Sequence, residues 1–204
     1  MNINYSQFLN MIPEVTLMAL LVIVFIADFF TAPRVVLPVA GQTSSASPRK
    51  WFNPLVCLLM AVHILVNIFP TATATAFGGM YCTNAAIGVM KTILSLGAFI
   101  VLIQSREWMR RPDTQFKEGE FYLLVISTLL GMNMMISANH FLLFFLGLEM
   151  ASVPMACLVG LDKYRHNSAE AAAKFILTAT FSSGVMLYGI SLLYAAVGTL
   201  YFDD

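Results

Sequence analysis

Hydrophobic residues occur in six long runs, and each run is followed by a more polar connection. Every run is close to the ~20 residues that a helix needs to cross the hydrocarbon of a bilayer. The pattern predicts an all-α, polytopic membrane protein with six transmembrane helices in a single membrane domain that covers residues 1–204. The six runs are residues 11–30, 54–70, 85–104, 121–137, 141–160 and 169–197.

Positive charges lie in alternate connections, after the first, third and fifth runs, and the other connections contain no Lys or Arg. Loops rich in Lys and Arg stay in the cytoplasm. We therefore expect a bacterial cytoplasmic (inner) membrane protein whose amino terminus faces outward. Because no basic residue precedes the first run, we expect that run to be a retained helix and not a cleaved signal peptide. The loop cations are Arg34, Arg49, Lys50, Arg106, Arg110, Arg111, Lys117, Lys163 and Arg165.

Composition narrows the class of protein further. Apolar residues make up 59% of the chain and charged residues 11%, whereas about a quarter of a soluble protein is charged. Eleven basic and eleven acidic residues balance, so the charge gives no sign of nucleic-acid binding. Three cysteines lie in separate segments, and no phosphate loop or dinucleotide fingerprint is present. We expect neither a bound metal nor a bound cofactor.

Glu149 is the acidic residue nearest the middle of a hydrophobic run. It is the ninth residue of a helix that starts at Phe141, which places it ~12 Å from the outer end. An ionised side chain at such a depth costs at least ~2.5 to 3.5 kcal/mol, and intramembrane acids usually mark proton or ion paths. The alternative is a protonated carboxyl group that links two helices by a hydrogen bond.

Glu170 and Lys174 form a second pair of interest at the start of the sixth run. Their spacing of four residues, with the acid first, places both side chains on one face of a helix, where they can pair. Two structural alternatives remain open. Glu170 follows Asn167 at the spacing of a capping box, and Lys174 is shallow enough to extend its amine to the cytoplasmic interface.

Lys91 and Glu14 lie toward the outer ends of the predicted helices, and His63 lies within the second run. Lys91 is expected to extend its amine to the outer interface. Glu14 follows Pro13 in a first helical turn, where a carboxylate favours the helix terminus. His63 lies among alanine, valine and isoleucine residues, and we interpret it as structural.

Several stretches resemble a known family. Residues 143–160 read LFFLGLEMASVPMACLVG, residues 168–175 read SAEAAAKF, and residues 182–189 read SSGVMLYG. They resemble the antiporter-like membrane subunits of proton-translocating NADH:quinone oxidoreductase (respiratory complex I), most closely the N type. The likeness extends to Ile12-Pro13-Glu14 and to the Phe77–Met80 segment and covers most of the chain.

The resemblance implies a fold of fourteen transmembrane helices with two inverted repeats of five. By its motifs, Glu149 corresponds to the family's glutamate of the fifth helix, and Glu170 and Lys174 to an acid and a lysine at the start of the sixth. These three residues are the expected proton relay. Ala156 departs from the family, in which tyrosine is common. Because the sequence ends after the sixth helix, we expect the amino-terminal portion of a longer subunit.

The resemblance also implies a function. The expected protein couples electron transfer from NADH to quinone to proton translocation, as a subunit without redox chemistry of its own. NADH, flavin, iron–sulfur clusters and quinone are expected on other subunits, and the expected partners are the lipid bilayer and neighbouring membrane subunits. A subunit of a multisubunit sodium/proton antiporter and a passive membrane scaffold are the alternatives.

Overall fold

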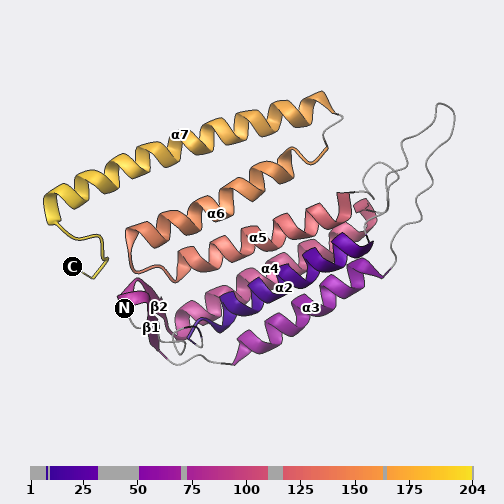
Figure 1. The fold of residues 1–204 in the computed structure, drawn as a ribbon, viewed down its shortest axis with the longest axis horizontal. Coiled ribbons are helices and arrows are strands. Elements are labelled where there is room, and N and C mark those ends of the chain that lie inside the picture. Colours follow the sequence, from indigo (N-terminus) through magenta and orange to yellow (C-terminus); the bar gives the residue numbers. More distant parts are fainter. Residues whose placement is uncertain are drawn as a thin grey trace.

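The computed structural model describes residues 8, 10–31, 51–69, 73–109, 117–162 and 165–203. Long helices run side by side along the molecule (Figure 1). In chain order they are α2 (Ile12–Thr31), α3 (Phe52–Ile68), α4 (Ala85–Met109), α5 (Glu118–Ile136), α6 (Phe141–Val159) and α7 (His166–Val197).

The predicted all-α membrane architecture is confirmed. Five helices, α2 and α4 to α7, are long and apolar enough to cross a membrane, and α3 is a shorter apolar helix of 17 residues. Some helices are longer than the apolar runs predicted from the sequence, and the additional residues are mainly polar ones at the helix ends. α4 continues to Met109 and α5 begins at Glu118. Polar residues end the part of a helix that can lie in hydrocarbon, but they do not end the helix itself.

The start of α7 corrects one expectation. The helix begins at His166 with Arg165 as its N-cap residue, three residues before the predicted run. Asn167 is therefore inside the helix and does not cap it, and Glu170 lies in the second turn. The alternative in which Asn167 and Glu170 form a capping box is therefore wrong.

The hydrophobic core lies among helices α2 to α5. Its side chains include Leu17 and Val24 from α2, Phe52 and Met60 from α3, and Tyr122 from α5, each fully enclosed. In contrast, α6 and α7 have few buried residues in this chain. These two outer helices form one side of the molecule (Figure 1).

One end of the molecule is closed by a small β-hairpin, and we call it the hairpin end. Strand β1 (Ala74–Ala76) pairs in antiparallel fashion with β2 (Tyr81–Thr83) around the 3-10 turn η1 (Phe77–Gly79). Gly78 has a φ of 68° and Gly79 a φ of 92°, values that glycine adopts without steric cost. Further bridges join Tyr81 to Ala138 and His140 to Tyr201. The hairpin, the α5–α6 turn and the segment after α7 therefore form one unit.

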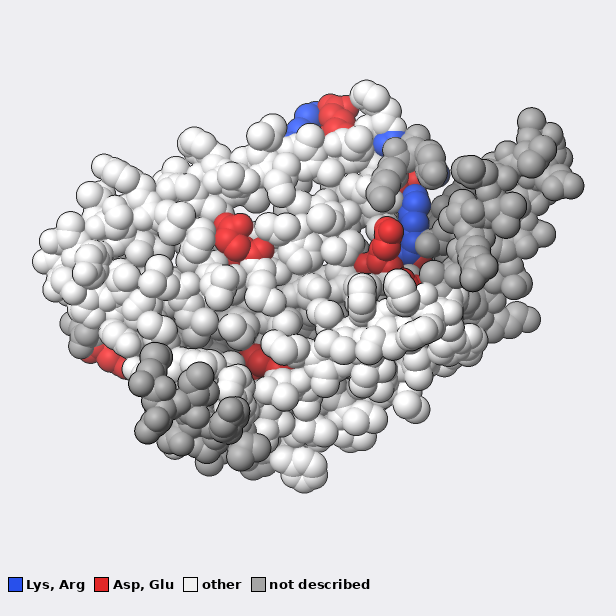
Figure 2. Space-filling view, in the orientation of Figure 1, with Lys and Arg blue, Asp and Glu red and all other residues white. Residues whose placement is uncertain are grey.

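The opposite end, which we call the cationic end, is where α2 and α4 end and α7 begins. On the face in Figure 2, the visible Lys and Arg atoms lie toward this end, and most of the surface is uncharged. Lys117 contacts Asp162 at 3.0 Å there and joins the start of α5 to the segment after α6. The other predicted loop cations, apart from Arg106 and Arg165, lie outside the described residues.

Candidate functional site

Glu149 lies near the middle of α6, as the sequence predicted, at the contact of α6 with α5. This contact is very close: a Cβ atom on Gly147 would lie 2.6 Å from the backbone nitrogen of Met135. The Glu149 side chain is half-buried, and none of the described residues bonds to its buried Oε1. A buried carboxylate oxygen without a donor is unfavourable.

Glu170 and Lys174 are brought together, as their spacing predicted. Lys174 Nζ lies 2.5 Å from Glu170 Oε1, and both side chains are largely exposed. An exposed ion pair contributes little to stability. Lys174 also lines a groove between α6 and α7, together with Val159 and Thr178. The described contacts join this pair to each other and not to Glu149.

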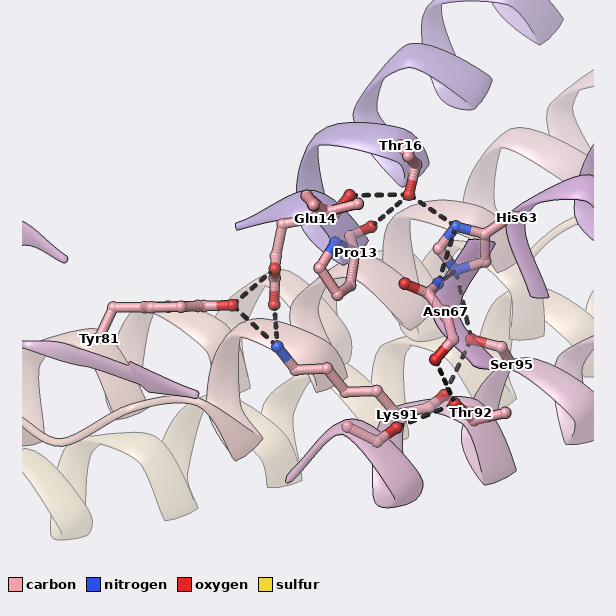
Figure 3. Close-up of polar contacts among 11 residues, drawn as sticks. Pro13, Glu14, Thr16, His63, Asn67, Tyr81, Lys91, Thr92 and Ser95 are labelled. Atoms are coloured by element: carbon pink, nitrogen blue, oxygen red, sulfur yellow. Dashed lines mark hydrogen bonds and ion pairs between the residues drawn. The ribbon is translucent and has the colours of Figure 1, made fainter. Parts of the chain in front are cut away.

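The structure also contains a buried ion pair that the sequence analysis missed. Lys91 Nζ lies 2.5 Å from Glu14 Oε1 and donates to the Tyr81 hydroxyl at 3.0 Å. That hydroxyl donates to Glu14 Oε2 at 2.8 Å (Figure 3). Exposure is 1% for Lys91 and 2% for Glu14. The expectation that Lys91 extends to the interface is therefore wrong. Glu14 lies in a first helical turn and also binds Lys91 and Tyr81.

Tyr81 supplies a neutral hydroxyl to this group. Burial, followed by the nearby negative charge of Glu14, raises the pKa of Tyr81 well above its ordinary value of 10. Tyr81 therefore stays protonated at neutral pH, accepting from Lys91 and donating to Glu14. We call Glu14, Tyr81 and Lys91 the hairpin-end triad; they come from α2, β2 and α4.

A second polar group surrounds His63 on α3. Thr16 Oγ1 lies 2.9 Å from His63 Nδ1, and Ser95 Oγ lies 3.3 Å from Nε2. Asn67 also contacts the imidazole ring. Ser95 Oγ donates to the backbone carbonyl of Lys91 at 2.9 Å. The His63 group therefore adjoins the triad (Figure 3), and His63 has polar partners that its apolar sequence neighbours do not suggest.

The described part of the chain contains no group of three or more His, Cys, Asp and Glu side chains that could hold a metal ion. Cys57, Cys82 and Cys157 are free thiols.

Apolar helices that carry acids and lysines within their length are the pattern expected of an antiporter-like membrane subunit. Residues 138–204 match the family described as "NADH:quinone oxidoreductase/Mrp antiporter, TM". Over nearly its whole length the chain is similar to proteins named NADH-quinone oxidoreductase subunit N.

Two curated relatives carry that subunit name. The protein of Phocaeicola vulgatus is 49% identical over 98% of this chain and 39% of its own length. The protein of Azobacteroides pseudotrichonymphae is 39% identical over 98% of this chain and 40% of its own length. The chain thus spans about two fifths of the length of the curated relatives it matches.

Solved structures agree on the fold. A chain of respiratory complex I from Thermus thermophilus with bound aureothin superposes with a TM-score of 0.71 and 25% identity, over 94% of this chain and 38% of that chain. A chain of the archaeal membrane-bound sulfane sulfur reductase superposes with a TM-score of 0.60 and 18% identity, over 97% of this chain and 39% of that chain. The second likeness concerns the fold alone.

Proposed function

We propose that this chain acts as part of a complex I subunit N, in which Glu149, Glu170 and Lys174 relay protons across the membrane. The proposal rests chiefly on Glu149 in the middle of a spanning helix, whose buried carboxylate oxygen has no partner in the part of the chain that the structure describes. The relatives named NADH-quinone oxidoreductase subunit N support the choice of complex.

Charge coupling between neighbouring groups supplies the mechanism. An ionised Glu149 favours the protonated form of a lysine within reach, and a neutral Glu149 withdraws that support, so the lysine releases its proton. Glu170 and Lys174 load protons from the cytoplasmic side. Moving one charge against 100 mV requires ~2.3 kcal/mol, a magnitude that a charge change at close range in a poorly hydrated site supplies.

The chain itself performs no redox step in this proposal. NADH, flavin, iron–sulfur clusters and quinone act on other subunits, and neighbouring membrane subunits of the complex are the direct partners. The membrane is the bacterial cytoplasmic membrane, with the cationic end inside and the hairpin end outside. The loop cations support this orientation through the positive-inside rule.

The test is a Glu149→Gln substitution in the full-length subunit of the assembled complex, with Glu149→Asp as the charge-retaining control. Membrane vesicles are given NADH, and acidification is followed with a pH-sensitive dye. We expect Glu149→Gln to lower proton pumping by roughly tenfold or more and Glu149→Asp to retain most of it. Normal pumping by an assembled Glu149→Gln complex would instead indicate a passive scaffold.

The family description also includes Mrp antiporters, so the same vesicles test sodium exchange. A proton gradient that forms with NADH and is unaffected by sodium supports the complex I function. Sodium-dependent proton exchange without NADH would contradict it.

A further inference from the structure

We propose that the hairpin-end triad of Glu14, Tyr81 and Lys91 is a second proton-exchange site, connected through buried water to His63. This inference rests on the proposed proton translocation. It concerns residues on α2, α3, β2 and α4, separate from Glu149, Glu170 and Lys174. The hairpin end faces outward in the proposed orientation, so this site serves proton release.

The geometry of the triad suits proton exchange. Lys91 Nζ and Glu14 Oε1 are 2.5 Å apart, and Tyr81 closes the ring by accepting from one and donating to the other. All three side chains are almost completely enclosed. Burial penalises two separated charges. Transfer of a proton from Nζ to Oε1 converts the pair into a neutral amine and a neutral carboxylic acid and removes that penalty.

The His63 group offers the next acceptor. Imidazole can accept a proton at one ring nitrogen and donate one from the other, and both nitrogens of His63 have polar neighbours, Thr16 at Nδ1 and Ser95 at Nε2. Ser95 is one turn from Lys91 on α4 and donates to its carbonyl. The two groups are therefore adjacent, although no described contact joins Lys91 Nζ to His63 directly.

Buried polar atoms around the triad favour water as the connection. Asn67 Oδ1 and both amide atoms of Asn133 are buried without a partner among the described residues, and the Ser137 side chain lies beside the Tyr81 hydroxyl. Ser137 lies beside the hairpin, because its carbonyl accepts from the Cys82 amide at 2.9 Å. Buried polar groups of this kind are normally satisfied by internal water. Three such atoms, one on Asn67 beside His63 and two on Asn133 one turn before Ser137, therefore indicate a hydrated region.

The elements packed around the triad contribute few other groups that titrate. Glu14 on α2, Tyr81 on β2 and Lys91 on α4 contact one another, and His63 on α3 contacts Ser95, one turn from Lys91. The α5 residues nearest the hairpin, Asn133 and Ser137, carry no charge. Cys82 on β2, His140 in the α5–α6 turn and Asp203 after α7 are the other ionisable side chains at this end, so the Lys91→Arg substitution is needed to assign a change in proton occupancy to the triad.

The competing explanation is an ion pair that only joins α2 to α4. Arginine separates the two cases, because it keeps the positive charge and can bond to Glu14 but does not release its proton. A structural pair tolerates Lys91→Arg, and a proton-exchange site does not. The matched control is Lys117→Arg, which makes the same substitution in the Lys117–Asp162 pair at the cationic end.

The experiment measures NADH-driven acidification by membrane vesicles that contain the assembled complex. We expect Lys91→Arg to lower the pumping rate about tenfold or more and Lys117→Arg to leave it unchanged. An assembled Lys91→Arg complex that pumps at the unmodified rate with an unchanged pH profile overturns the proposal. If Lys91→Arg prevents assembly, His63→Gln decides: a lowered rate with a flattened pH profile supports the site, and an unchanged rate overturns it.

The Glu149→Gln variant separates the two proposals. Loss of pumping in Glu149→Gln with normal pumping in Lys91→Arg refutes the hairpin-end site alone. Normal pumping in both refutes the function on which it rests.

Discussion

The close contact between α5 and α6 leads to a sharp prediction for Gly131→Ala. A Cβ atom on Gly131 would lie 2.5 Å from the backbone nitrogen of Ala151, 2.6 Å from the carbonyl carbon of Met150 and 2.9 Å from the Gly147 carbonyl oxygen. These neighbours are backbone atoms, so no side-chain rotation relieves the overlap. Ordinary contact begins near 3.4 Å, and the helices must therefore separate by almost 1 Å.

Overpacking of this kind costs about 1–3 kcal/mol. Alanine is the better helix former by about 1 kcal/mol, which offsets part of the cost. We expect a net loss of up to about 2 kcal/mol. The matched control is Gly97→Ala in α4, where an added Cβ meets nothing within 4 Å. The control substitution should be neutral or slightly stabilising, because the higher helix propensity of alanine is then the only effect expected.

The assay heats the purified complex in detergent and follows the loss of intact complex over time. Such a rate is a suitable measure for a large membrane assembly that does not unfold reversibly. We expect Gly131→Ala to be lost several times faster than the unmodified complex, and Gly97→Ala to match it. Equal lifetimes for the two variants would refute the argument from α5–α6 contact.

Two further predictions concern the ends of the molecule. For Tyr81→Phe we expect a loss of about 1–3 kcal/mol at neutral pH, because the Glu14 carboxylate loses a buried donor; heat inactivation measures it. Since the pKa of Tyr81 is raised by burial and by Glu14, the stability tied to its proton is complete below pH ~10 and declines above it. The difference between the unmodified complex and Tyr81→Phe should narrow at pH 11, and a constant difference would contradict the assignment. For Lys117→Ala we expect a loss below about 1 kcal/mol, reduced further by salt, since Asp162 is partly exposed. A larger loss that salt does not change would contradict it.

The sequence predicted the helices well because a bilayer imposes a simple requirement on length and apolarity. Lys174 pairs with Glu170 as expected, since a spacing of four residues fixes their proximity within one helix. The Asn167 cap failed because helix ends depend on local backbone geometry, which polar residues indicate only loosely.

The hairpin-end triad could not be predicted from spacing, because Glu14 and Lys91 are 77 residues apart. A usable signal did exist. Both residues lie near the same ends of their predicted helices, at similar depth and with opposite charge, and a buried lysine needs such a partner. What the sequence lacks is the lateral order of the helices, which decides whether α2 and α4 face each other. Tyr81, in a short hairpin strand, gave no such signal.

The bridges at the hairpin end have a consequence for biogenesis. Tyr201 pairs with His140, and Tyr81 pairs with Ala138, so residues made early in translation are fastened by residues made much later. The ribosome must deliver α7 to the translocon before this seal can close. Until then, the Tyr81–Ala138 bridge between the hairpin and the α5–α6 turn is the one of these two bridges that can form.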